Sequence, residues 1–262
     1  SNGIVPIRLS EKEYVRAHDF RRYLHKNLED FIIETPLENP LDFLNKKFDA
    51  SLIKDVQTKW IPYDFKNQNI DDFLENLNID KTVEISSIQG GYSNAIKQLN
   101  KFIEVGYQDY AKYRSDPSKE ASSQLSPYFH SGQISTHEVF DKISELESWS
   151  PESINSKMVG RREGWWGSSE NFESFMDELI TWRELGYHTC VRRANYNQYS
   201  SLPEWAIKTL HEHSSDEREH IYSLDELTYS QTHDEIWNAA QNQLRTQGVI
   251  QNYLRMLWLS LI

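Results

Sequence analysis

The chain has 262 residues, of which 38% are hydrophobic and 26% charged, a composition typical of a globular protein with one large core or two modest ones. Forty acidic residues against 28 basic ones give a net charge of −12, which argues against a protein that coats nucleic acid through bulk charge. No apolar run of about 18 residues and no signal-peptide pattern occur, and Cys190 is the single cysteine. We therefore expect a cytoplasmic protein without a membrane span, a disulfide framework or a cysteine-cluster metal site.

The N-terminal segment predicts one strand followed by one helix. Residues 3–7 (GIVPI) are a short β-like run, and Ser10 and Glu13 have the spacing of a capping box before a helix that extends to about Ile33. A lone strand leaves its backbone groups unpaired, and the rest of the chain supplies no obvious partner strand. Residues 1–35 are therefore expected to be the end of a larger α/β domain.

The next segment, residues 36–89, predicts a connector with brief helical turns. It contains Pro36, Pro40 and Pro62 and many Asn and Asp residues, and its apolar runs are short. Gly90 and Gly91 then mark a break, and after them apolar residues recur at the spacing of a helix. We expect residues 90–262 to form one helical domain.

A Ser-Pro pair predicts the start of a helix at Ser126. The hydroxyl of Ser126 is expected at the N-cap and Pro127 at the first helical position, where its missing N–H costs nothing. With Ser122 and Ser123 nearby, this helix start offers a cradle for phosphate oxygens. The alternative is an ordinary helix start that binds no ligand, as most Ser-Pro starts are.

The most informative stretch is residues 161–190. One apolar stripe at three- and four-residue steps predicts an amphipathic helix set against a core, and it consists of Phe172, Phe175, Met176, Leu179 and Ile180. Glu178 and Trp182 lie four residues apart on the same helix, so a carboxylate and a flat ring stand side by side. This pairing suits a planar heterocycle held by one hydrogen-bonded edge and one stacked face. The alternative is a half-buried acid beside a core tryptophan.

Positive charge flanks this helix at both ends, in Lys157, Arg161, Arg162, Arg192 and Arg193. These residues either form a local basic face or are ordinary solvated surface. Further helices are expected over residues 203–213 and on both sides of Gly248. No metal-ligand spacing, nucleophile elbow, P-loop or dinucleotide-binding fingerprint occurs, so the sequence predicts no familiar hydrolytic motif.

Taken together, the motifs resemble the cryptochrome/photolyase superfamily, and within it the bacterial class II cyclobutane pyrimidine dimer photolyases. The resemblance rests on ordered stretches that span most of residues 90–258: the Gly90-Gly91 pair, YxxxRSDP, SxLSP, SGQIS, REGWWG, ELITWREL, PEWAIKTL, REHIYSLDEL, THDxxWNAAQ and NYLRMLW. It implies a mainly α-helical FAD-binding domain that begins at residue 90, preceded by a strand–helix remnant of an N-terminal α/β antenna domain. Relatives continue beyond the position of Ile262, so we expect the chain to be truncated at its C-terminus.

The resemblance also implies roles for particular residues. The positions similar to those that hold the FAD diphosphate are Tyr110, Ser122, Ser123, Leu125 and Ser126, and those similar to flavin-side cations are Arg183 and Arg255. The cavity for a flipped-out pyrimidine dimer is implied for Glu178, Trp182, Asn252 and Met256, with the carboxyl group bonded to a base edge and the indole stacked. Trp258 and Trp237 resemble the first two members of the tryptophan relay that passes electrons to photoexcited flavin.

The activity implied by the resemblance is light-driven repair of cyclobutane pyrimidine dimers in DNA by electron transfer from photoexcited reduced FAD. The expected partner is UV-damaged DNA, the expected state is a monomer, and a longer chain could hold a second antenna chromophore. Two positions depart from the family pattern: relatives often have His where Gln251 stands, and a Gly-Lys-Lys run where this chain has Leu259, Ser260 and Leu261. The alternatives are a cryptochrome-like or degenerate FAD-binding photoreceptor without repair activity, and a helical interaction module that has lost its flavin.

Overall fold

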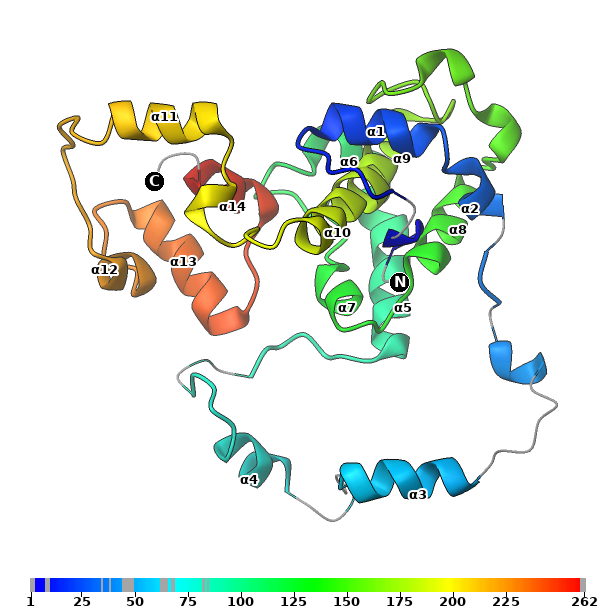
Figure 1. Ribbon diagram of the computed structural model, residues 1–262, viewed down its shortest axis with the longest axis horizontal. Helices are drawn as coiled ribbons and strands as arrows, with labels where there is room; N and C mark the ends of the chain where they lie inside the picture. Colours follow the sequence, from blue (N-terminus) through cyan, green and yellow to red (C-terminus); the bar gives the residue numbers. More distant parts are fainter. Residues whose placement is uncertain are drawn as a thin grey trace. The chain divides into compact units, whose positions relative to one another are not determined.

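A computed structural model describes residues 3–7, 10–33, 35–37, 39–43, 50–61, 66, 69–81, 83 and 85–259 of the chain. The described residues form helices and no strand, which confirms the expected mainly α-helical class (Figure 1). The chain divides into two compact units, one of residues 1–35 and 86–262 and the other of residues 36–85. The domain boundaries expected from the sequence, after residues 35 and 89, remain a prediction.

Three consecutive helical segments form the centre of the first unit: α9 (Glu170–Met176), the π-helix η7 (Asp177–Trp182) and α10 (Arg183–Arg192). The hydroxyl of Ser169 begins this run as an N-cap, because it accepts a hydrogen bond from the backbone N–H of Phe172. All five members of the predicted apolar stripe are buried. The pattern therefore predicted the buried face correctly, but not the π-helical segment, in which the turns widen to i→i+5 hydrogen bonds.

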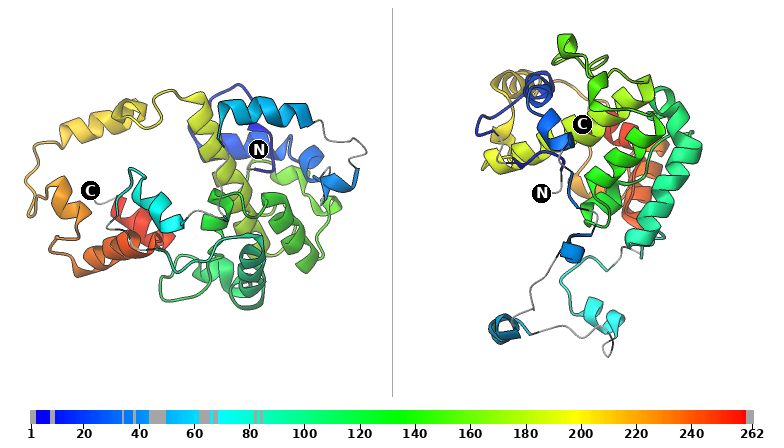
Figure 2. Two further views of the ribbon diagram at one scale, coloured as in Figure 1. Left: turned by 90° about the horizontal axis from the view of Figure 1, so that it is seen from below. Right: turned by 90° about the vertical axis from the view of Figure 1, so that its right-hand side faces the viewer.

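The helices around this centre come from both sides of it in sequence. Helix α5 (Tyr92–Lys101) continues through the π-helix η3 (Phe102–Gly106) and the 3₁₀ turn η4 (Tyr107–Asp109) into α6 (Tyr110–Tyr113). Helices α6 and α9 pack together, and α1 (Ala17–His25) packs on η7 (Figures 1 and 2). Gly106 allows a close approach, because a Cβ there would lie 2.8 Å from the carbonyl oxygen of Glu120.

The remaining described helices of this unit complete the core and extend from it. Around the core lie α2 (Glu29–Ile33), α7 (Ser126–His130), α8 (Thr136–Leu146) and the 3₁₀ turns η5 (Pro151–Ser153) and η6 (Ser156–Met158). Beyond α10 follow the 3₁₀ turn η8 (Tyr199–Ser201), α11 (Glu204–Glu212), α12 (Leu224–Thr228), α13 (Glu235–Gln247) and α14 (Asn252–Leu259). Gly248 ends α13 in the left-handed conformation, as the predicted interruption requires.

The N-terminal prediction was wrong in three respects. Residues 3–7 form no strand: residues 3–5 are bends, and the N–H of Val5 donates to the Glu184 carboxylate, 3.2 Å away, instead of to a neighbouring strand. The expected capping box at Ser10 does not form, because the Ser10 hydroxyl accepts from the N–H of Lys12 and helix α1 begins only at Ala17. The expected helix is also divided into α1 and α2.

The start of α7 differs from the prediction by one residue. Leu125 is the N-cap and Ser126 the first helical residue, and no side chain caps this end. Leu125 is completely buried, so packing of its side chain fixes where the helix begins.

The second unit contains the 3₁₀ turn η2 (Pro40–Phe43), α3 (Ala50–Lys59) and α4 (Ile70–Glu75). Asn69 caps α4 by accepting from the N–H of Asp71, 3.0 Å away. None of the described side chains of this unit is buried.

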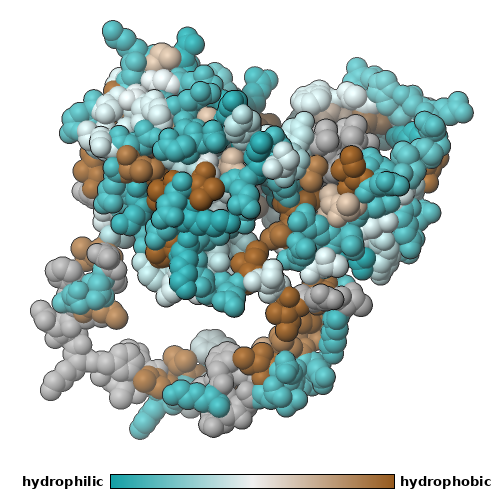
Figure 3. All heavy atoms as spheres, turned by 180° about the vertical axis from the view of Figure 1, so that it is seen from behind, coloured by the Kyte–Doolittle hydropathy of each residue, from teal (hydrophilic) through white to brown (hydrophobic). Residues whose placement is uncertain are grey.

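Figure 3 shows polar and charged side chains over much of one face, interrupted by apolar ones. Large apolar side chains are exposed on the helices beyond α10, for example Trp205 on α11 at 73%. Within the described part of the chain, no helix is long and apolar enough to cross a bilayer.

Candidate functional site

The π-helix η7 carries both Glu178 and Trp182, the pair singled out from the sequence. Four residues make slightly less than one turn of a π-helix, so the two side chains leave the helix on nearly the same side. Leu179, Ile180 and Thr181 between them are buried, whereas Trp182 is 48% exposed and the Glu178 side chain 33%. The acid and the indole therefore lie on the outer face of a helix whose inner face is fixed by the core.

Arg114 holds the Glu178 carboxylate from a different helix. Its Nη1 donates to Glu178 Oε1 over 2.7 Å, and its guanidinium lies 5.8 Å from the centre of the Tyr110 ring. Tyr110 begins α6 and Arg114 directly follows it, so the two lie one helical turn apart. Arg114 is the arginine of the YxxxRSDP motif, for which no role was predicted, although its four-residue spacing from Tyr110 places both side chains on one helix face.

Asp177 is paired in the same way on the inner side of η7. Arg21 of α1 grips it with two hydrogen bonds, Nε to Oδ1 at 2.8 Å and Nη2 to Oδ2 at 2.9 Å, and both side chains are buried. Two neighbouring acids of η7 therefore meet two arginines from different parts of the chain. The two hydrogen bonds from Arg21 to Asp177 fix both distance and orientation, whereas Arg114 bonds to Glu178 through a single one.

The residues expected on α14 lie at the start of that helix. Asn252 and Arg255 are exposed and bonded to each other, and Met256 is 54% exposed. Gln251, just before the helix, donates from Nε2 to the backbone carbonyl of Arg114 over 3.0 Å. The contact brings the start of α14 to the residue that holds Glu178.

The two relay tryptophans lie on different helices, Trp237 on α13 and Trp258 on α14. Trp237 is half-buried on α13, where the carboxylate of Asp234 caps the helix start. Trp258 falls within α14, but its side chain lies outside the described residues. Their role in electron transfer stays a prediction.

Four of the five residues expected at a diphosphate lie on one loop and the helix after it, and the fifth, Tyr110, begins α6. Ser122 and Ser123 are half-buried, Leu125 is buried and Ser126 is exposed. Gln124 between them has a φ of 54°, a conformation that costs a non-glycine residue energy and that recurs at functional loops. Leu125 after this turn is buried, and its N–H donates to the Ser123 hydroxyl over 3.4 Å.

Arg183 connects this region to the central helix. Its guanidinium lies 4.7 Å from the ring centre of Phe129, on α7 directly beyond Ser126, and 5.3 Å from that of Tyr187. Burial raises the pKa of the Tyr110 hydroxyl, with the Arg114 charge opposing the shift, so this group stays protonated and can donate. Three serine hydroxyls, a phenol and a guanidinium are the kind of donors that bind a phosphate oxygen. The donor set therefore fits a diphosphate, although the grouping of all five predicted residues around one ligand remains a prediction.

The predicted basic face is partly engaged within the protein. Arg192 donates to the Ser10 carbonyl over 2.8 Å, and Arg193 is paired with Glu13 and donates to the Ser201 carbonyl over 2.7 Å. Arg162 lies 3.9 Å from the Asp177 carboxylate but keeps 56% of its side chain exposed. The arginines at the end of α10 thus fasten the N-terminal segment to that helix.

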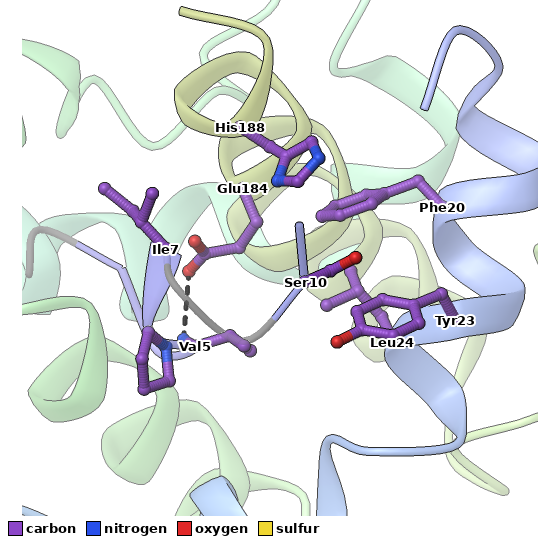
Figure 4. Close-up of a pocket in the computed structure, with 9 residues that line it drawn as sticks. Val5, Ile7, Ser10, Phe20, Tyr23, Leu24, Glu184 and His188 are labelled. Carbon is purple, nitrogen blue, oxygen red and sulfur yellow. Dashed lines mark hydrogen bonds between the residues drawn. The ribbon is translucent and has the colours of Figure 1, made fainter. Parts of the chain in front are cut away.

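A small hollow lies where this segment meets α10 (Figure 4). Its lining includes Glu184, His188 and Tyr23. Burial raises the pKa of Glu184 to about 7, against the stabilising N–H groups of Val5 and Ile4. One turn further along α10, His188 Nε2 lies 2.6 Å from the carbonyl oxygen of Lys12. The hollow is therefore a junction between two segments and does not adjoin Glu178 through any lining residue.

No protein-family model matches the chain. It is 31% identical over 259 residues to the deoxyribodipyrimidine photo-lyase of Methanothermobacter thermautotrophicus, covering 98% of this chain and 49% of that protein. A bacterial class III photolyase from Agrobacterium tumefaciens aligns with 98% of this chain and 45% of that chain at a TM-score of 0.56 and 20% identity, a likeness of fold. Cryptochrome-2 of Arabidopsis thaliana is 50% identical over 50 residues, 19% of this chain. The chain thus spans about half the length of the photolyase it matches, and the resemblance inferred from its motifs is confirmed.

Proposed function

From the premise that the chain is a relative of the photolyases, we propose that it is the flavin-binding part of an enzyme that uses light to repair cyclobutane pyrimidine dimers in DNA. The observation that carries the proposal is the outward-facing pair of Glu178 and Trp182 on η7, held by Arg114 and backed by a buried face. Similarity to a photolyase over 98% of the chain supports the same conclusion.

The cofactor of this reaction would be FAD. Its diphosphate would be held by Tyr110, Ser122, Ser123, Leu125 and Ser126, and Arg183 and Arg255 would be the cations on the flavin side. When bound, reduced and excited by light, FAD supplies the electron that opens the cyclobutane ring. The protein supplies the binding site and the electrostatics.

Glu178 and Trp182 would hold the flipped-out dimer. An ionised carboxylate only accepts hydrogen bonds, so Glu178 would receive an N–H from a base edge. The exposed indole of Trp182 would stack on a base, a contact that is worth roughly 1–3 kcal/mol per base in other proteins. A dimer is already poorly stacked in the duplex, so its extrusion costs less than that of normal bases, which contributes selectivity for damage.

The proposal is tested by repair of an oligonucleotide with a single thymine dimer. Flavin binding is read from the visible spectrum, and repair under blue light from chromatography of the product. We expect Glu178→Ala to lower the repair rate at limiting DNA by about tenfold or more, as loss of a charged hydrogen bond of roughly 1.5–3 kcal/mol requires. Flavin content should not change.

Glu170→Gln is the matched control, because Glu170 is an exposed acid in the first turn of α9. It should repair like the parent protein. Repair by Glu178→Ala at the parent rate would show that Glu178 does not hold the substrate.

The second candidate is a cryptochrome-like photoreceptor that binds FAD but repairs nothing. The local match of 50% identity to a cryptochrome favours it, as does the departure of Leu259 from the family pattern. Photoreduction of bound flavin without dimer repair would select this candidate. A colourless protein that takes up no added FAD would contradict both.

A further inference from the structure

Arg114 lies between two groups of residues that the proposed function places around one substrate. Its guanidinium bonds to Glu178 on η7 over 2.7 Å, and its backbone carbonyl accepts from Gln251 over 3.0 Å. Gln251 in turn accepts from the N–H of Leu254 over 3.2 Å in the first turn of α14. One residue therefore joins the acid of η7 to the helix that carries Asn252 and Met256.

The contact to Glu178 leaves part of the carboxylate available. Only Oε1 is bonded to Arg114, and Oε2 has no hydrogen bond to any residue within the described ranges. With 33% of the Glu178 side chain exposed against 20% for Arg114, the acid reaches further toward solvent than the guanidinium. A base edge can therefore bond to Oε2 while Arg114 keeps Oε1 in place.

The environment of Arg114 restricts its own motion. Its guanidinium lies 5.8 Å from the centre of the Tyr110 ring. That ring is itself buried against Phe102 and Phe175, with centroid separations of 5.7 Å and 5.2 Å. A guanidinium packed against an anchored aromatic ring has few alternative positions, so the carboxylate that it grips is oriented before substrate arrives.

We infer that Arg114 is a positioning residue for damage recognition: it orients the Glu178 carboxylate and ties the start of α14 to it, so that both meet the same lesion. The inference rests on the proposed function. This role of Arg114 differs from that of a residue that holds the DNA backbone. Loss of a positioning residue changes the preference for damaged over undamaged DNA, whereas loss of a phosphate contact changes the affinity for both alike.

The test measures DNA binding in the dark, so that repair does not enter. Fluorescence anisotropy compares two labelled duplexes of one sequence, with and without a single thymine dimer, for flavin-loaded protein. Arg114→Met should lower the affinity for the damaged duplex about tenfold and leave that for the undamaged duplex within twofold. Arg114→Lys, which keeps the charge but loses the planar guanidinium that packs against Tyr110, should recover only part of the loss.

Two further variants separate the explanations. Lys112→Met removes the same charge from an exposed position on α6, and it should not change the ratio of the two affinities. In the double variant Arg114→Met with Glu178→Gln, the loss should be no larger than that of the more damaging single change, because both act through one contact. The visible spectrum and the thermal midpoint of each variant show that flavin and fold are retained.

The outcomes are distinct. An equal loss of affinity for both duplexes in Arg114→Met, or fully additive losses in the double variant, would overturn the positioning role while the proposed function stands. A parent protein that binds both duplexes equally would contradict the proposed function itself.

Discussion

Glu184 on α10 is an acid whose side chain is almost completely buried. It is 4% exposed, and its carboxylate accepts from the N–H of Val5 while the backbone of Gly3 packs so closely that a Cβ there would lie 1.9 Å from Oε1. Burial outweighs these hydrogen bonds and raises its pKa to about 7. Other charged or titratable groups near the carboxyl are Arg183, on the same helix, and His188 in the same hollow.

The consequence is a stability that depends on pH. In the unfolded chain Glu184 releases its proton near its ordinary value of 4.5, whereas in the folded chain it keeps it up to about 7. The folded state therefore binds more protons in this interval, and the free energy of unfolding falls as pH rises from about 4.5 to 7. A shift of this size corresponds to roughly 3 kcal/mol in all.

We predict that Glu184→Gln removes this contribution. Urea unfolding of both proteins between pH 4.5 and 8 should show a free-energy difference that grows in favour of the variant as pH rises. The free-energy difference between the two proteins is compared at each pH, because His25 affects both of them equally. Burial lowers the pKa of His25 to about 4, so the free energy of unfolding falls toward low pH in both proteins. A difference independent of pH would show that Glu184 titrates normally.

At the same scale, the sequence predicted part of the candidate site. The acid and indole of η7 were found from their spacing and from the family resemblance, both of which are local in sequence. Arg114 was not found, because its contact with Glu178 joins positions 64 apart and no periodic pattern records such a pairing. The hydrogen bond of Glu184 to Val5 was missed for the same reason, at a separation of 179.

At the scale of elements, the buried pair of Arg21 and Asp177 fastens α1 to η7. Their side chains are 9% and 5% exposed. Removal of Arg21 alone would leave the buried carboxylate with only Arg162, 3.9 Å away, and loss of a buried partner costs roughly 3–5 kcal/mol in comparable cases. Replacement of both by apolar groups avoids that cost.

We therefore predict that Arg21→Met destabilises the protein by about 3–5 kcal/mol and that Arg21→Met combined with Asp177→Leu restores much of the loss. Chemical unfolding of the three proteins at one pH measures both effects. Arg22→Met is the control, since Arg22 is a neighbouring arginine on the same helix that is not buried. A double variant as unstable as Arg21→Met would contradict the explanation.

The elements were predicted well where their pattern was long. The apolar stripe of α9 and η7, the helix after Pro203 and the break at Gly248 all appear as expected. The strand predicted at residues 3–7 was wrong. The side chains of Ile4 and Val5 are buried in the core, but no strand among the described residues lies beside them to form a sheet. Propensity describes a side chain's preference for a pleated surface, and here tertiary packing decided the backbone.

At the scale of the whole molecule, the two units differ in how many side chains they bury. The first unit contains a continuous core in which Leu99, Tyr107 and Phe172 are fully buried. The described part of the second unit has no buried side chain, and its helices α3 and α4 are short. Helices of this length are marginal without a packed face.

We predict that amide hydrogens of α3 and α4 exchange with solvent at least a hundredfold faster than those of α5 and α9. Hydrogen exchange followed by mass spectrometry at neutral pH measures this, with peptides from α8 as an internal reference for the core. Equal protection of both units would show that the second unit buries surface of its own.

Cys190, the single cysteine of the sequence, is exposed near the end of α10, the helix that directly follows Trp182. A maleimide dye would therefore attach at one known place, without any prior substitution. Its fluorescence would give an optical signal from the helix next to the proposed recognition surface, so that arrival of a damaged duplex could be timed in a stopped-flow instrument on the native sequence.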